Sequence, residues 1–167
     1  MKKLVVLLTL ALCAAFAGAA LAATATGTYA TTATVAAAGT CTVGSGAAFF
    51  GTITPPITAN IEIANSGFGV NCPNGTPYSI ALSAGGSGNF AQRQMSEATT
   101  PTDKLNYNIY TDSFFVSIWG DGTGSTATVS ANGNGSQQAY FPGVRVPVQP
   151  TPPAGSYADV VTITVTF

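Results

Sequence analysis

The amino-acid sequence predicts an all-β sandwich, and three observations lead to this prediction. Short segments in which apolar and polar residues alternate recur along the chain, separated by clusters of Gly, Pro, Asn and Asp. No convincing amphipathic helix follows the N-terminal apolar segment. The last eleven residues alternate almost perfectly, as a strand does beside a core. Many short strands with such spacing are typical of two packed antiparallel sheets.

Residues 1–22 have the organisation of a secretory signal peptide. Lys2 and Lys3 precede an apolar run over residues 4–16, and small residues follow as far as Ala22. We therefore expect cleavage after Ala22 and export of the mature chain. The run is too short to span a bilayer comfortably, and no later segment is both long and apolar enough, so membrane insertion of the mature chain is not expected.

The length and charge of the mature chain limit its class. The 167 residues, less the signal, suit one domain with a real core. The charged side chains of the mature chain are few: Glu62, Glu97, Asp103, Asp112, Asp121 and Asp159 against Arg93, Lys104 and Arg145. Nucleic acid is a poor partner for this surface, because neutralising phosphates requires clustered Lys and Arg.

Cysteine usage agrees with export. Loss of the signal removes Cys13 and leaves Cys41 and Cys72 as the only pair. An oxidising compartment would join such a pair in one disulfide, and two cysteines alone cannot build a zinc site.

The clearest predicted hairpin joins residues 68–72 to residues 78–82. Asn74-Gly75 in the connection supplies the positive φ that a tight turn requires. The segments that follow, residues 84–89 and 92–103, are predicted to be a loop and a longer irregular connection outside the core.

Further strands are predicted by alternation. Residues 105–109 and 114–118 each place three apolar side chains on one face, before a turn at residues 119–123. Val129 lies in another candidate strand, and residues 132–135 form a turn. Residues 144–148 alternate again, and the prolines at 147, 150, 152 and 153 place that region at a sheet edge or in a loop.

The C-terminal segment predicts a half-buried strand with an open edge. Its apolar face consists of Tyr157, Val161, Ile163, Val165 and Phe167, and its other face of Thr162, Thr164 and Thr166. An uncovered apolar edge invites another chain to pair with it, so the protein is expected either to hide this edge or to use it.

The Thr-rich segment over residues 25–35 also predicts an extended strand. Its odd positions carry Tyr29, Thr31, Ala33 and Val35, while the even positions are mostly threonine. The β-branched content and the absence of Pro and charge suit addition to the sheet edge of another chain. Only Tyr29 and Val35 are large, so the apolar stripe is weak.

Together these motifs resemble the spore coat protein U domain family, which includes the pilins of the archaic chaperone–usher pathway. The resemblance covers essentially the whole mature chain. Its motifs are Cys41-Thr-Val43 after a Thr-rich leader, Asn71-Cys72 with Gly75-Thr76, residues 78–82, residues 105–112, Trp119-Gly-Asp-Gly122, and residues 153–159 with the Val/Thr tail.

The resemblance implies an immunoglobulin-like sandwich that lacks its final strand and is completed by donor-strand complementation. A periplasmic chaperone would hold the subunit, an outer-membrane usher would assemble it, and the N-terminal strand of an identical or related subunit would fill the gap. Residues 23–37 would be the donor strand, with Tyr29, Thr31, Ala33 and Val35 on its inserted face, and residues 38–167 the incomplete domain. Cys41 and Cys72 would form the disulfide, and Val161, Ile163, Val165 and Phe167 would line the acceptor groove. The chain would pass through the periplasm to the cell surface as a fibre subunit.

Other functions stay open. A spore or cell coat protein of the same fold would pack laterally without the N-terminal strand, and a tip adhesin is a weaker choice. An enzyme has the least support: histidine is absent, which excludes Ser-His and Cys-His arrangements, and Asp103 with Asp112 is a poor candidate dyad. No catalytic residue, cofactor or metal is therefore predicted.

Three local motifs have simpler explanations than a ligand site. Residues 121–124 are predicted to be a turn and not a calcium or phosphate loop, because no further carboxylate or lysine is near. The glycosylation patterns at Asn74 and Asn134 are attributed to loop chemistry. Trp119 is expected to close an end of the sandwich, not to stack on a sugar.

Overall fold

The computed structural model describes residues 30–33, 39–63 and 67–167, and the predicted signal peptide lies outside these residues. The chain divides into two compact units, residues 1–35 and 36–167. In the first unit, residues 30–33 are exposed and belong to no regular element. Every described strand belongs to the second unit. Within the described ranges, no helix is long and apolar enough to cross a membrane.

The second unit is built from short strands, as the alternation predicts. Its described elements are β1 (Thr42–Val43), β2 (Ile61–Ile63), β3 (Phe68–Asn71), β4 (Pro77–Leu82), the 3-10 helix η1 (Gly85–Ser87), β5 (Arg93–Glu97), β6 (Lys104–Tyr110), β7 (Val129–Asn132), β8 (Gln137–Tyr140), β9 (Gly143–Val146), β10 (Tyr157–Ala158) and β11 (Ile163–Thr166).

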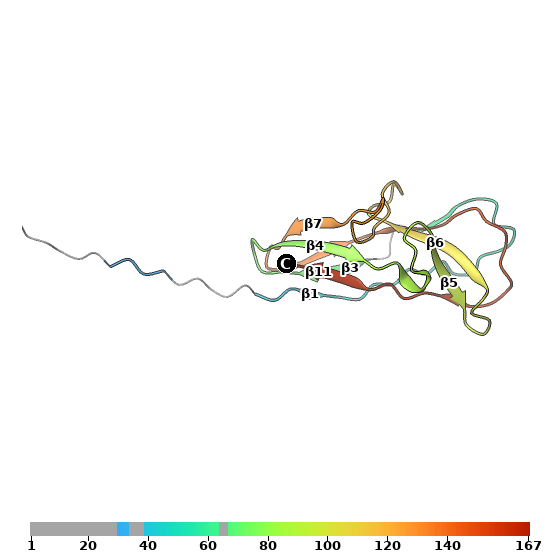
Figure 1. The fold of residues 1–167 in the computed structure, drawn as a ribbon, viewed down its shortest axis with the longest axis horizontal. Helices are drawn as coiled ribbons and strands as arrows, with labels where there is room; N and C mark the ends of the chain where they lie inside the picture. Colours follow the sequence, from blue (N-terminus) through green and yellow to red (C-terminus); the bar gives the residue numbers. More distant parts are fainter. Residues whose placement is uncertain (1–29, 34–38, 64–66) are drawn as a thin grey trace, which may run out of the picture. The chain divides into compact units, whose positions relative to one another are not determined.

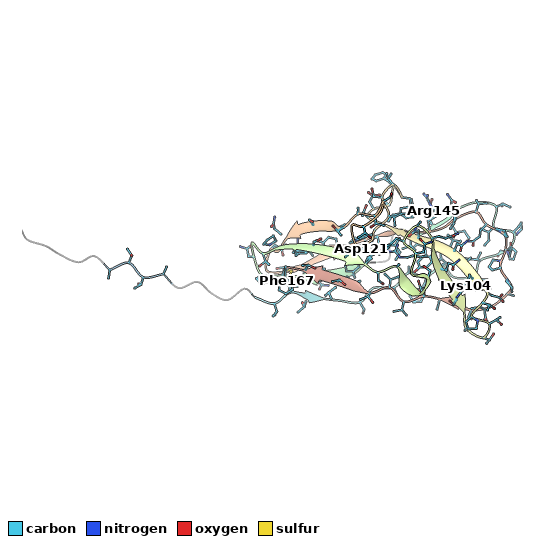
Figure 2. The ribbon with its side chains drawn as sticks, viewed as in Figure 1. Lys104, Asp121, Arg145 and Phe167 are labelled. Atoms are coloured by element: carbon cyan, nitrogen blue, oxygen red, sulfur yellow. A yellow bond between two sulfur atoms is a disulfide. The ribbon has the colours of Figure 1, made fainter. Side chains whose placement is uncertain are left out.

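These strands form three antiparallel ladders. Two have three strands, in the orders β1-β3-β8 and β11-β4-β7, and the third has five, in the order β10-β5-β6-β9-β2. Figure 1 shows β11 beside β4 near the C-terminus, with β5 and β6 at the other end of the domain. Figure 2 accordingly places Phe167 and Lys104 at opposite ends. The all-β prediction is confirmed.

The predicted hairpin between residues 68–72 and 78–82 is wrong. The turn exists, since Thr76 N donates to Pro73 O and Gly75 has φ 78°, but β3 pairs with β1 and β8 while β4 pairs with β11 and β7. The connection bonds instead to the turn between β7 and β8, through Gly75 N to Gly133 O and Gly133 N to Thr76 O. The chain therefore crosses from one sheet to the opposite one.

That crossing creates the first part of the core. The side chains of Val70 and Ile80 are fully buried and belong to one cluster, which they enter from opposite sheets. A strand pair within one sheet could not place both apolar faces against each other. The full buried cluster comprises Phe68, Val70, Cys72, Tyr78, Ile80, Leu82 and Trp119.

A second buried cluster lies under the five-stranded sheet. Its members are Ile57, Leu105, Tyr107, Val144 and Val146. The half-buried Ile109 and Val161 pack against both clusters. The interior is thus continuous along the domain, and Trp119 packs within the first cluster with its Nε1 donating to Ile80 O at 3.0 Å.

The expectation that residues 92–103 lie outside the core is also wrong. Residues 93–97 form β5, which pairs with β6 and β10, and the side chain of Arg93 is fully buried. Arg-Gln-Met-Ser-Glu lacks the β-branched and aromatic residues that mark strands in a sequence. The two neighbouring strands supply the pairing that the local propensity does not.

The strand predicted at residues 114–118 is absent. Phe114 and Val116 are exposed, and Phe115 has φ 57°. Asp112 Oδ1 accepts from Phe114 N at 2.8 Å and turns the chain. Only Ile118 returns to β6, through an isolated bridge to Tyr110. The prolines near residue 147 behave as expected, since they follow β9 in a loop.

Cys41 and Cys72 are joined by a disulfide with Cα atoms 4.3 Å apart, which confirms the predicted pairing. The bond ties the residue before β1 to the residue after β3, where Cys72 is fully buried.

We predict that Cys41→Ser lowers the free energy of unfolding by about 3–4 kcal/mol, because opening a loop of 31 residues restores the entropy of the unfolded chain. Urea unfolding of variant and parent measures this difference, and reduction of the parent with dithiothreitol is the control. Equal midpoints for oxidised parent, reduced parent and variant would contradict it.

Glu97, at the end of β5, is held by the turn that follows. Its Oε2 accepts from Thr99 Oγ1 and Thr99 N at 2.7 Å and from Thr100 N. These hydrogen bonds to the ionised form lower the pKa of Glu97 from 4.5 to about 2. The carboxylate thus stabilises the fold fully above about pH 4.5, and this contribution disappears as the pH falls to about 2.

Glu97→Gln is therefore expected to be less stable than the parent at pH 7, with the difference shrinking between pH 4.5 and 2. Unfolding free energies of both proteins across this range provide the measurement. A difference that stays constant with pH would show that the ionised form of Glu97 has no special role.

Candidate acceptor groove

Two edge strands, one from each three-stranded sheet, lie on the same side of the domain. β1 is the edge of β1-β3-β8, and β11 is the edge of β11-β4-β7. β3 leads into the turn at residues 73–76 and β4 leads away from it, so these strands run in opposite directions. β1 is antiparallel to β3 and β11 to β4. β1 and β11 therefore run in opposite directions, and no described strand lies between them.

An open groove lies between the segments that continue these edges. Its first part, which we call hollow 1, has a volume of about 380 Å³. Residues 46–50 form one lip and residues 157–163 the other. The floor comprises Phe68, Leu82, Met95, Tyr107, Ile109 and Val144, which belong to or pack against the two core clusters. The interior of the sandwich is thus accessible from outside.

A second hollow continues the first. Hollow 2 has a volume of about 590 Å³ and lies between residues 48–57 and the Pro-rich residues 151–157, above Leu105 and Met95. Five residues border both hollows and lie between them: Ala48, Phe49, Phe50, Met95 and Tyr157. The two hollows therefore form one groove, divided near its middle by large side chains.

The lips of the groove carry large apolar side chains that face solvent. Phe49 is 84% exposed on one lip and Val160 is 83% exposed on the other. Exposed apolar groups beside an open apolar groove are typical of surfaces that bind other molecules.

The residues predicted to line an acceptor groove lie in different environments. Val161 and Ile163 line hollow 1. Val165 is half-buried and packs against the first core cluster. Phe167 is 56% exposed and borders a separate shallow hollow over β4 and β7.

The predicted donor residues belong to the other unit. Thr31 and Ala33 are exposed, and Tyr29 and Val35 lie outside the described residues.

Hollow 1 has one polar corner. Tyr107 Oη donates to Asp159 Oδ2 at 2.7 Å, and Asp159 Oδ1 accepts from Gly86 N at 2.9 Å and Val160 N at 2.8 Å. Burial, followed by the hydrogen bond to Asp159, raises the pKa of Tyr107 above its ordinary value. Asp159 is the only charged side chain among the described residues that line the hollow.

The model of the Spore Coat Protein U domain matches residues 25–164, which is most of the chain. The chain belongs to this family. No curated protein matches it. The fold of this spore coat protein U domain is similar to that of a chain in the crystal structure of the CsuC–CsuE chaperone–tip adhesion subunit pre-assembly complex, from the archaic chaperone–usher Csu pili of Acinetobacter baumannii. The identity is 26% and the TM-score 0.51, over 76% of this chain and 39% of that chain.

The match confirms an immunoglobulin-like sandwich and a pilus or coat subunit in general terms. The family is a structural, non-enzymatic one. The present chain spans about two fifths of the length of the Csu chain that it resembles.

Sequence reasoning missed the buried Arg93, which organises the back of the groove in this spore coat protein U domain. Its guanidinium donates to Ser83 O at 2.8 and 3.0 Å, to Asn108 Oδ1 at 2.7 Å and to Trp119 O at 2.7 Å. Desolvation by burial lowers the pKa of Arg93. The bonds join β5, β6 and the segments after β4 and before β7. An arginine in a predicted irregular segment gave no sequence signal for this role.

Ser83 connects this network to the groove. Ser83 N donates to Thr162 O at 2.9 Å, and Ser83 Oγ accepts from Thr162 N at 2.9 Å. Thr162 lies on the lip between Val161 and Ile163, so Arg93 fixes the position of this lip through a single intermediate residue.

Among the residues that it describes, the structure brings no catalytic or ligand-binding groups together at the alternative sites considered from the sequence. Asp121 Oδ1 accepts from Thr123 N and Thr123 Oγ1, as expected for a turn. Asp103 and Asp112 lie beyond opposite ends of the extended strand β6 and do not form a pair. Within the described residues, no cluster of three or more His, Cys, Asp and Glu side chains could hold a metal ion.

We predict that Arg93→Lys lowers the free energy of unfolding by about 3 kcal/mol, because lysine cannot replace all four hydrogen bonds and leaves buried carbonyl oxygens without donors. Arg145→Lys is the matched control, since the ion pair of Arg145 with Glu62 is partly exposed; its effect should stay within about 1 kcal/mol. Urea unfolding measures both, and similar losses for the two variants would contradict the prediction.

Proposed function

We propose that this protein is a structural subunit of a secreted surface fibre, a pilus, assembled by chaperone–usher donor-strand exchange. The observation that carries the proposal is the apolar groove between two sheet edges without a described strand between them. The N-terminal segment over residues 23–37 of one subunit would fill the groove of the next, with Tyr29, Thr31, Ala33 and Val35 facing inward.

The energetics favour such an insertion. At about 25 cal/mol per Å² of apolar surface, a strand that covers several hundred Å² contributes on the order of 10 kcal/mol before ordering costs. Its backbone can also pair with the free groups of β1 and β11. A subunit with an empty groove is expected to be marginally stable and to gain most of its stability on joining.

The geometry leads to a linear assembly. Each subunit gives a strand from one end and receives a strand at a different surface, so the contact is heterologous. Such a contact grows as an open fibre unless a rotation closes it into a ring.

The proposed partners follow from the related structure. The related chain comes from a pre-assembly complex of a chaperone and a tip adhesion subunit. We assign the present chain a periplasmic chaperone that occupies the groove before exchange, an outer-membrane usher, and identical or related subunits. The assembled fibre would lie on the cell surface after passage through the periplasm.

A coat subunit is the second candidate, because the matching family model describes a spore coat protein. A coat subunit that packs laterally would assemble without residues 23–36, whereas the fibre subunit requires them. A tip adhesin, to which the related complex refers, would appear only at fibre ends in immunogold micrographs, whereas a rod subunit would be labelled along the fibre.

Removal of residues 23–36 is predicted to abolish the ladder of detergent-resistant oligomers that the parent forms before boiling, because a buried inserted strand is released slowly. The shortened chain should instead bind a peptide of residues 23–36. Gel electrophoresis of unboiled samples and fluorescence anisotropy of labelled peptide make the measurements, with a scrambled peptide as control. A shortened chain that is monomeric, stable and indifferent to the peptide would refute the proposal.

A further inference from the structure

The two hollows follow each other along the groove, as the two large side chains follow each other in the proposed donor strand. Along the lip formed by the C-terminal segment, residues 151–157 border hollow 2 and residues 157–163 border hollow 1. The middles of these stretches are six residues apart in the sequence, with a bend at residues 154 and 155. Tyr29 and Val35 are also six residues apart in the sequence, and in an extended strand they would share one face about 20 Å apart.

The residues between them match the divided middle of the groove. Thr31 and Ala33 are the inward positions between Tyr29 and Val35, and both are small. Phe50, Met95 and Tyr157 separate the hollows. A donor strand with large, small, small and large inward side chains would therefore place its two small residues where these shared side chains lie.

The polar corner of hollow 1 offers a charged acceptor to a tyrosine, whereas hollow 2 offers only neutral groups among its described residues, such as Thr52, Thr151 and Ser156. A buried tyrosine needs a partner for its hydroxyl. Among the described residues, Asp159 Oδ1 accepts two hydrogen bonds and Oδ2 accepts one, from Tyr107. A carboxylate oxygen can accept two, so Oδ2 has room for a further donor. No described residue that lines hollow 2 carries a charge.

We propose that Tyr29 of one subunit enters hollow 1 of the next, where its hydroxyl donates to Asp159 Oδ2, and that Val35 enters hollow 2. The proposal rests on the proposed function and adds the register and direction of the inserted strand. The hydrogen bond between Tyr29 and Asp159 would then set the register of the inserted strand.

This register fixes the direction of the strand. Hollow 1 lies towards Ile163 and hollow 2 towards Thr151. A strand with Tyr29 near Ile163 and Val35 near residues 151–157 runs opposite to the C-terminal segment, and hence antiparallel to β11. Since β1 and β11 run in opposite directions, the same strand is parallel to β1, so its direction rests on the positions of the two large side chains.

Site-specific cross-linking tests the register in otherwise unchanged subunits. Tyr29→p-benzoylphenylalanine is introduced into the full chain, assembled oligomers are irradiated, and the linked peptides are identified by mass spectrometry. Links to Tyr107, Val161 or Ile163 of another subunit are expected. Links to Ile57 or to residues 151–155 would overturn the proposal.

A double-mutant cycle tests the hydrogen bond. Tyr29→Phe should speed the heat-induced loss of the unboiled oligomer ladder by roughly 10- to 100-fold, the effect of losing a hydrogen bond to a charged group. The same change in an Asp159→Asn background should have a much smaller effect. Equal effects in both backgrounds, or none in the parent, would refute the contact, and if Asp159→Asn does not fold, the cross-links still decide the register.

The outcomes separate the two proposals. A chain without residues 23–36 that still forms the ladder would refute donor-strand exchange itself. A ladder that requires those residues but links position 29 to hollow 2 would refute only the register.

Discussion

The structure depends on one constraint: two sheet edges, β1 and β11, run in opposite directions beside an apolar interior, and no described strand lies between them. Backbone groups at such edges need partners, and apolar side chains beneath them need cover. A single extended segment meets both needs, because it can pair with each edge while its side chains fill the groove. In either orientation the inserted segment is antiparallel to one edge and parallel to the other. The side chains of the segment, and not the two edges, therefore determine its direction.

The rest of the fold holds the two lips of the groove in place. The Cys41–Cys72 disulfide fastens the segment around β1 to β3. On the other lip, Thr162 is bonded twice to Ser83, whose carbonyl accepts from the buried Arg93. The C-terminal lip is therefore held by hydrogen bonds to the body of the domain, and the disulfide anchors the chain just before the strand that leads to the other lip. Preorganisation of this kind lowers the ordering cost of association.

The sequence predicted which side chains of a strand face the core better than it predicted which strands pair with each other. Alternation correctly placed β6, β9 and β11, and cysteine counting found the disulfide. The same alternation could not reveal that β3 and β4 belong to opposite sheets, because a turn such as Asn74-Gly75 serves a hairpin and a crossing equally. β5 was missed because its pairing comes from its neighbours. The sequence did not predict that residues 46–57 border the groove, since they form no described strand and their apolar residues show no periodic spacing. Only the C-terminal lip, with Val161 and Ile163, alternates.

The low apolar content of residues 25–35 is consistent with the shape of the groove. Phe50, Met95 and Tyr157 border both hollows, so in the proposed register they leave less room for large side chains at positions 31 and 33 than the hollows do. Smaller residues bury less area, and the attachment then depends more on backbone pairing with β1 and β11 and on the end positions. Since backbone pairing is indifferent to sequence, discrimination among related strands falls to the few side chains that reach a hollow. A carboxylate at the corner of one hollow is well suited to this role, because a hydrogen bond to an ionised group is stronger than one between neutral groups.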